Sequence, residues 1–100
     1  MEQIRENCLM LCRALEANYH QHGYCSLQGF VVEELRKFYK IIQVGQHQRS
    51  VHAFVDKKTG DVYKPAGWKA PAKHVRFNII KQFDEVLEKA DWAGGYLYIR

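Results

Sequence analysis

The sequence predicts a single α+β domain in which helices cover one face of an antiparallel sheet. Three observations lead to this fold class: residues 2–22 and 71–90 carry apolar side chains at helical spacing, and residues 36–64 alternate between strand-like runs and short polar turns. The chain has 100 residues, of which 47% are apolar, which suffices for one core but not for two domains. We therefore expect one domain over residues 1–100, in the order α-β-β-β-α-β, with an antiparallel β-meander and two helices packed on one face.

The first predicted helix, residues 2–22, presents one apolar face formed by Ile4, Cys8, Leu11, Cys12, Leu15 and Tyr19. Two of the three cysteines lie on this face, and the third is Cys25. A zinc site is the alternative, because His20 and His22 follow, but the chain contains no C-x2-C pair. We interpret Cys8 and Cys12 as buried side chains of a reduced, cytoplasmic protein and predict no metal site.

The predicted strands are short and follow one another closely. They cover residues 36–45, 50–56 and 61–64, with a hairpin turn at residues 57–60. In the second strand, His52 and Phe54 share one face of the sheet. Residues 24–35 fit either a short strand or a loose helical turn, and both interpretations stay open.

The second predicted helix covers residues 71–90. Apolar side chains recur there at intervals of three and four residues, and Pro71 suits the first helical position, where a missing N–H costs nothing. Residues 91–95 break the pattern with two glycines, and residues 96–99 predict a last strand. The alternation does not decide which face of the sheet is buried.

Positive charge is concentrated in one segment. The whole chain has a net charge of +4, but residues 57–81 alone hold seven lysines and arginines against a single acid. Such a local excess predicts an anionic partner at one place on the surface. A solvated basic face is the alternative interpretation.

The second predicted helix is charged in the opposite sense to its dipole, with acids in its later turns and cations before and within its first turns. The cations are Lys64, Lys69, Lys73, His74 and Arg76. An anion bound there would turn this repulsion into attraction, because a helix N-terminus offers free N–H donors. We therefore predict that these five residues bind phosphate. Arg76 also falls inside the apolar arc, where it needs a carboxylate, an anionic ligand or a route to water.

Aromatic residues supply two candidate stacking positions. Trp68 lies between Lys64 and Lys69 in a Pro- and Gly-rich loop, where it either stacks on a nucleobase or plugs the loop onto the core. His52 and Phe54 form the second candidate, a stacking platform on an open face of the sheet. The alternatives for that face are a dimer interface or a covering segment.

No catalytic set emerges from the sequence. The order of elements resembles the core of restriction-like nucleases, which need an acid on one strand and Asp/Glu-x-Lys on the next. Here Lys64 follows Asp61 three residues on instead of two, which turns the lysine to the other sheet face. We can assign no Ser-His-Asp set and no catalytic carboxylate pair, so the sequence favours a protein without enzymatic activity, and we predict no cofactor.

Residues 48–78 resemble a known class of sequences. The runs Gln48–Asp56, Thr59–Lys73 and Val75–Asn78 are similar to small uncharacterised proteins of tailed bacteriophages, including phages of marine cyanobacteria. The resemblance implies a viral origin and action in the host cytoplasm. It carries over no catalytic or binding residue.

Two functions are expected from these patterns. The first is a phage-derived, non-catalytic binding module for a phosphate-bearing ligand, either nucleic acid or a nucleotide, at the basic loop and the N-terminus of the second helix. The alternative is a protein-interaction or host-inhibitory module that acts as a homodimer, or on a host protein, through the open sheet face. We expect no membrane partner, because the chain has no apolar run long enough to span a bilayer.

Overall fold

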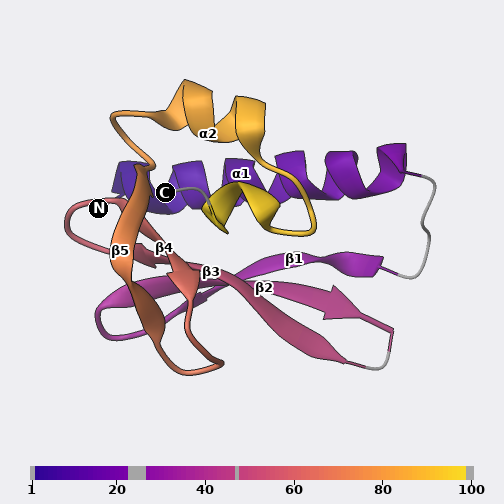
Figure 1. The fold of residues 1–100 in the computed structure, drawn as a ribbon, viewed down its shortest axis with the longest axis horizontal. Coiled ribbons are helices and arrows are strands. Elements are labelled where there is room, and N and C mark those ends of the chain that lie inside the picture. Colours follow the sequence, from indigo (N-terminus) through magenta and orange to yellow (C-terminus); the bar gives the residue numbers. More distant parts are fainter. Residues whose placement is uncertain (1, 23–26, 47, 99–100) are drawn as a thin grey trace.

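The computed structural model of the protein describes residues 2–22, 27–46 and 48–98. In chain order its elements are α1 (Glu2–Gln21), β1 (Leu27–Glu34), β2 (Phe38–Gly45), β3 (Arg49–Asp56), β4 (Asp61–Pro65), β5 (Pro71–Asn78), α2 (Phe83–Lys89) and the 3₁₀ helix η1 (Gly95–Tyr98). The strands form one antiparallel sheet in the order β1-β2-β3-β4-β5, so the predicted α+β meander is confirmed. Figure 1 shows α1 and α2 on the same face of this sheet.

The long helix α1 packs the predicted apolar face onto the sheet. Its side chains Ile4, Cys8, Leu11, Cys12 and Leu15 are at most 5% exposed and share one core cluster with residues of all five strands. Burial raises the pKa of the Cys8 and Cys12 thiols to about 12, so both thiols are neutral. The prediction that both cysteines are buried is confirmed. Cys25 lies outside the described residues. In the part of the chain that is described, no helix is both long and apolar enough to cross a membrane.

Residues 27–34, which fitted two interpretations, form the edge strand β1. Its register with β2 places Val32 opposite Ile41, on the face that α1 covers. The outer edge of β1 is tied to the helix, because the N–H of Phe30 donates a hydrogen bond of 2.9 Å to Oε2 of Glu16. A backbone donor that another strand would use is therefore already satisfied.

The prediction of a helix over residues 71–90 is wrong in its first half. Residues 71–78 form β5, which pairs with β4 and sets Phe77 opposite Val62 and Val75 opposite Tyr63. This pairing buries Phe77 to 2% exposure and satisfies the backbone, which outweighs a helical spacing of apolar residues. A strand also has little net dipole, so the cations of this segment escape the penalty that a helix would impose. The helical part is Phe83–Lys89.

The side chain of Asn78 ends β5 and starts the turn to α2. Its Oδ1 accepts hydrogen bonds of 2.9 Å from the N–H groups of both Ile80 and Lys81. Its Nδ2 donates to the carbonyl of Thr59 at 2.8 Å and to Asp61 Oδ1 at 3.0 Å. One side chain thus joins the β3–β4 turn to the β5–α2 turn.

The predicted last strand, residues 96–99, is also wrong where it is described. Residues 95–98 form η1, and Ile99 lies outside the described residues. A turn closed by the N–H of Gly94 and the carbonyl of Asp91 brings the chain back over the sheet, and Gly94 adopts a φ of +83° there. Tyr96 and Leu97 consequently fill the core instead of extending an edge of the sheet.

We expect Asn78→Ala to lower the free energy of unfolding by about 2 kcal/mol, because it leaves backbone groups of two turns without partners. Urea unfolding followed by circular dichroism measures the change. Lys81→Ala, at an exposed neighbouring position, is the control and should change the free energy by less than about 0.5 kcal/mol. Equal effects of the two substitutions would contradict the role given to Asn78.

Candidate nucleic-acid interface

The candidate site forms where β3 and β4 diverge. These strands pair at two positions, Phe54 with Tyr63 and Val55 with Val62. Beyond them β3 continues along β2, while β4 continues along β5, and Figure 1 shows the β4–β5 hairpin crossing the β1–β3 ribbon. Side chains with functional chemistry gather around this divergence on both faces of the sheet.

A β-bulge separates the two residues of the predicted stacking platform. The register between β2 and β3 shifts by one residue at His52. His52 consequently lies on the α1 face, where its ring meets Phe30 edge-on with centroids 5.4 Å apart. Phe54 lies on the opposite face against Phe38, and the exposures of His52 and Phe54 are 6% and 0%. The predicted open platform is therefore wrong.

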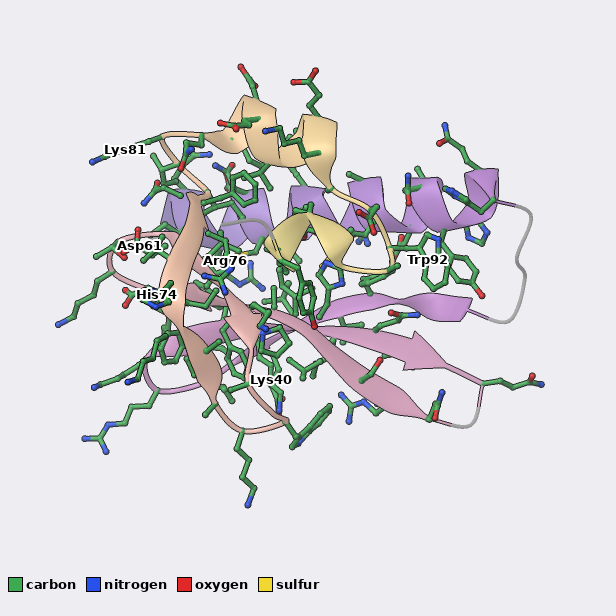
Figure 2. All side chains as sticks on the ribbon, in the orientation of Figure 1. Lys40, Asp61, His74, Arg76, Lys81 and Trp92 are labelled. Carbon is green, nitrogen blue, oxygen red and sulfur yellow. The ribbon has the colours of Figure 1, made fainter. Side chains whose placement is uncertain are left out.

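On the face opposite α1, Trp68 covers a buried lysine. The Nζ of Lys40 lies 3.4 Å from the centroid of the Trp68 ring and 5.9 Å from that of Phe54. The Cζ of Arg49 lies 5.9 Å from the same Trp68 centroid. Figure 2 shows Lys40 pointing away from the helices. We call Lys40, Arg49, Trp68 and the adjacent Lys69 the Trp68 surface.

The charge of Lys40 is stabilised by an aromatic ring rather than by a carboxylate. Glu33 lies opposite Lys40 in the register of β1 and β2, yet among the described residues Lys40 forms no ion pair. Lys40 is 3% exposed, so its ammonium needs a partner, and the face of an indole is the best aromatic one. Trp68 itself stays 42% exposed, which leaves much of its surface available to a ligand.

The loop that carries Trp68 is closed by its own backbone. The N–H groups of Ala66 and Gly67 both donate to the carbonyl of Ala70, at 3.0 and 3.2 Å. The sequence identified Trp68 but missed Lys40 and Arg49, which are distant along the chain and reach the ring only through the β2–β3 pairing. Trp68 therefore does not pack into the core beneath α1. Its ring lies on Lys40 and stays partly exposed to solvent.

The predicted phosphate-binding residues do not surround a helix N-terminus, because residues 71–78 form a strand. Lys64 lies with its Nζ 4.3 Å from the centroid of Tyr98 in η1. Arg76 donates from Nε to the carbonyl of Leu97 at 2.6 Å and from Nη1 to that of His74 at 2.9 Å. Figure 2 shows Arg76 directed toward η1. Arg76 therefore satisfies its charge on backbone carbonyls and holds η1 on the sheet.

Three of the predicted residues remain on the surface. Lys69, Lys73 and His74 are exposed, and in the described chain their side chains form no ion pair. Lys69 lies in the loop next to Trp68 along the chain, and Lys73 and His74 lie on the outer strand β5. The positive charge predicted from the sequence is thus spread along the β4–β5 hairpin rather than focused at one helix end.

A second cluster of cations lies at the opposite end of β2 and β3. A hollow of about 450 Å³ is lined by Arg36, Lys37, Asp56, Lys57 and Lys58. Lys57 is paired with Glu34 at 2.7 Å, and Asp56 accepts the N–H groups of its own turn. The hollow keeps a positive excess, to which Arg36 and Lys37 contribute from outside the basic segment 57–81 that the sequence showed.

On the α1 face, the divergence of β3 and β4 leaves a small pocket. Its volume is about 140 Å³, and it is lined by Gln43, Ser50, Val51, His52, Pro65, Trp92, Ala93, Gly94 and Tyr98. We call it the His52 pocket. His52 Nε2 lies 2.8 Å from the hydroxyl oxygen of Tyr96. Burial lowers the pKa of His52 to about 4 against a smaller opposing effect of Asp91, so the imidazole is neutral at pH 7.

The described residues offer no evident metal centre. Among them, no three His, Cys, Asp or Glu side chains come together in a way that could hold a metal ion. Asp56, the last residue of β3, accepts hydrogen bonds from the N–H groups of Lys58 and Thr59 at 2.7 and 3.0 Å.

The fold and these surfaces define a class: a small α+β protein with a five-stranded meander and a basic, aromatic surface on the hairpin that crosses it. The chain belongs to a family of unknown function, DUF7717, whose model matches residues 1–99. The search of curated proteins and the search of solved structures each find no match.

The stability of the protein should fall as the pH drops from about 6.5 to about 4. In that range the unfolded chain binds a proton at His52 and the folded chain does not, so acid favours unfolding. His52 causes no loss of stability above about pH 6.5. The loss grows as the pH falls and stops growing below about pH 4, where it amounts to on the order of 3 kcal/mol. Urea unfolding at several pH values between about 7 and about 4 measures the slope.

The control for this prediction is the double variant His52→Phe/Tyr96→Phe, which removes the titrating group together with its hydrogen-bond partner. Its stability should depend less on pH over the same range. A wild-type slope that the double variant retains in full would show that other groups cause it.

Proposed function

We propose that the protein is a non-catalytic binding module for a phosphate-bearing ligand, with single-stranded nucleic acid or a nucleotide bound at the Trp68 surface. The observation that carries the proposal is the half-exposed Trp68 ring lying on Lys40, 3.4 Å from its ammonium. Proteins that bind single strands combine a cationic groove for the backbone with aromatic faces for the bases. Both elements occur here within one loop and the strand beneath it.

The cations around the ring support a phosphate contact. Arg49 lies near the Trp68 ring on one side, and Lys69 and Lys73 follow in the loop and β5. Since Lys69 and Lys73 have no carboxylate partner in the described chain, a phosphate would not have to displace an ion pair. Neutralising phosphates with such side chains releases counterions, which makes binding salt-dependent. The resemblance of residues 48–78 to phage proteins stays a prediction.

The proposal is tested with fluorescence polarisation of labelled ten-nucleotide single strands at several salt concentrations. The logarithm of the affinity should fall linearly with the logarithm of the salt concentration. Lys69→Ala/Lys73→Ala should reduce the slope by about 1 to 2, roughly 0.7 for each lost phosphate contact. Trp68→Ala should weaken binding by about 1–3 kcal/mol, the usual loss per stacked base.

Lys81→Ala is the matched control, because this exposed lysine belongs to the same basic segment but lies beyond β5. It should leave the affinity within a factor of two. The absence of binding at low salt to both oligonucleotides and free nucleotides would overturn the proposal.

A second candidate function is a homodimer or partner contact through the sheet face opposite α1. Two apolar side chains favour it, Val31 with 42% and Val75 with 49% exposure. The centre of that face is closed, however, because Phe54 and Ile42 are fully buried. Light scattering coupled to size exclusion at several protein concentrations measures the mass, and a dimer that Val75→Lys dissociates is the expected result. A monomer at all concentrations would exclude the homodimer.

A further inference from the structure

The His52 pocket and the Trp68 surface flank the same opening in the sheet. Ser50 lines the pocket, and the preceding residue, Arg49, reaches toward the Trp68 ring. Pro65 also lines the pocket, and the loop that carries Trp68 begins directly after it. The two sites therefore lie on opposite faces of the sheet, at the same opening between β3 and β4, and one strand could reach both only by passing this opening.

Inside the pocket, His52 keeps one ring nitrogen unused. Its Nε2 is engaged with Tyr96, but within residues 2–22, 27–46 and 48–98 no hydrogen bond reaches Nδ1. None of the described side chains has a nitrogen or oxygen that is both fully enclosed and unbonded, so Nδ1 is reached from the pocket. A Cβ placed on Gly94 would lie 3.9 Å from Nδ1, which locates this nitrogen at the Gly94 wall. A polar atom so nearly buried gains free energy when a ligand group pairs with it.

The lining of the pocket matches a flat, polar ring. Gln43 and Ser50 are opposite one another in the β2–β3 register and supply an amide and a hydroxyl. The rings of Trp92 and Tyr98 supply aromatic walls. An amide, a hydroxyl and a neutral imidazole together offer donors and acceptors, as the edge of a nucleobase requires.

The size of the pocket restricts which base fits. Its volume of about 140 Å³ is close to that of an engineered protein cavity, about 150 Å³, known to accept benzene. A single six-membered ring therefore matches this volume, whereas the fused double ring of a purine would extend out of the pocket. At the rim, the ammonium of Lys64 lies over the Tyr98 ring at 4.3 Å, where it can contact the phosphate of the same nucleotide.

We propose that the His52 pocket binds the base of a pyrimidine nucleotide, paired with His52 Nδ1, Gln43 and Ser50, while Lys64 contacts its phosphate. This inference rests on the proposed function and names the ligand class that the surface selects. The Trp68 surface then stacks on another base of the same strand without preference, and the pocket supplies the selectivity.

The test compares single strands of equal length that differ only in their bases. Ten-nucleotide oligo-dT, oligo-dC and oligo-dA, together with an abasic strand, are titrated by fluorescence polarisation at one salt concentration. We expect the two pyrimidine strands to bind at least tenfold more tightly than oligo-dA. Uridine and adenosine monophosphates are added as competitors, and a free pyrimidine nucleotide should compete more strongly than the purine one if the pocket also takes single nucleotides.

The variant that isolates the pocket is His52→Phe/Tyr96→Phe. Removing both hydrogen-bond partners while keeping two aromatic rings leaves neither group unsatisfied, so the fold should persist. We expect this variant to lose the tenfold preference and to keep the salt-dependent binding that all strands share. Gln43→Leu, at a half-buried position of the lining, is the second variant and should reduce the preference by itself. Circular dichroism confirms that each variant is folded.

The outcomes separate the two proposals. Equal affinity for pyrimidine, purine and abasic strands would overturn the pocket assignment and leave the proposed function intact. A preference that both variants retain would overturn it as well, because the selectivity would then arise elsewhere. If no strand and no nucleotide binds at low salt, the proposed function itself fails.

Discussion

The short pairing between β3 and β4 is the constraint on which the rest of the structure depends. Two residue pairs hold these strands together, and the sheet then separates into a β1–β3 ribbon and a β4–β5 hairpin that crosses it. Such a separation opens the sheet on both faces, and each face needs its own cover. On the α1 side the cover is η1, which Arg76 holds through the carbonyl of Leu97. On the other side it is the loop around Trp68.

Each of these two segments contributes an aromatic side chain that contacts a buried polar side chain. Lys40 has the ring of Trp68, and His52 has the hydroxyl of Tyr96 together with the edge of Phe30. Within the described part of the chain, neither side chain forms an ion pair or hydrogen bond with a carboxylate. Among the described residues, the hairpin lysines Lys64, Lys69 and Lys73 also form no ion pair, so the positive field of the hairpin extends outward.

The parts of the fold that the sequence predicted are those with local signals. The stripe on α1, the strands β2 to β4 and the turn at Gly60, whose φ is +82°, all follow from spacing and residue type. The strand at residues 71–78 was not predicted, because its apolar positions fit a helix. Only the pairing with β4 determines that this segment is a strand. Its reversed charges indicated an unfavourable helix, and the chain avoids that cost by forming a strand instead of by binding an anion.

The candidate site was predictable only in part. Trp68 and its neighbouring lysines were visible because they are contiguous, whereas Lys40 approaches from a strand that lies nearly thirty residues earlier. The His52 pocket depends on a bulge, and a regular alternation of apolar and polar residues gives no sign of one. The pairing of distant strands therefore determined which side chains are in contact. The residue types determine which interactions these side chains can make with a ligand.

The bond between Glu16 and the backbone of Phe30 has a consequence for how the molecule behaves at high concentration. An exposed sheet edge is a template for adding strands from other chains, which leads to fibrils or runaway polymers. At β1 the helix carboxylate occupies a donor that such a strand would need. At β5 the strand begins with Pro71, which has no N–H to offer. One position on each edge strand is therefore closed to a further strand, which hinders growth of the sheet by edge addition at high concentration.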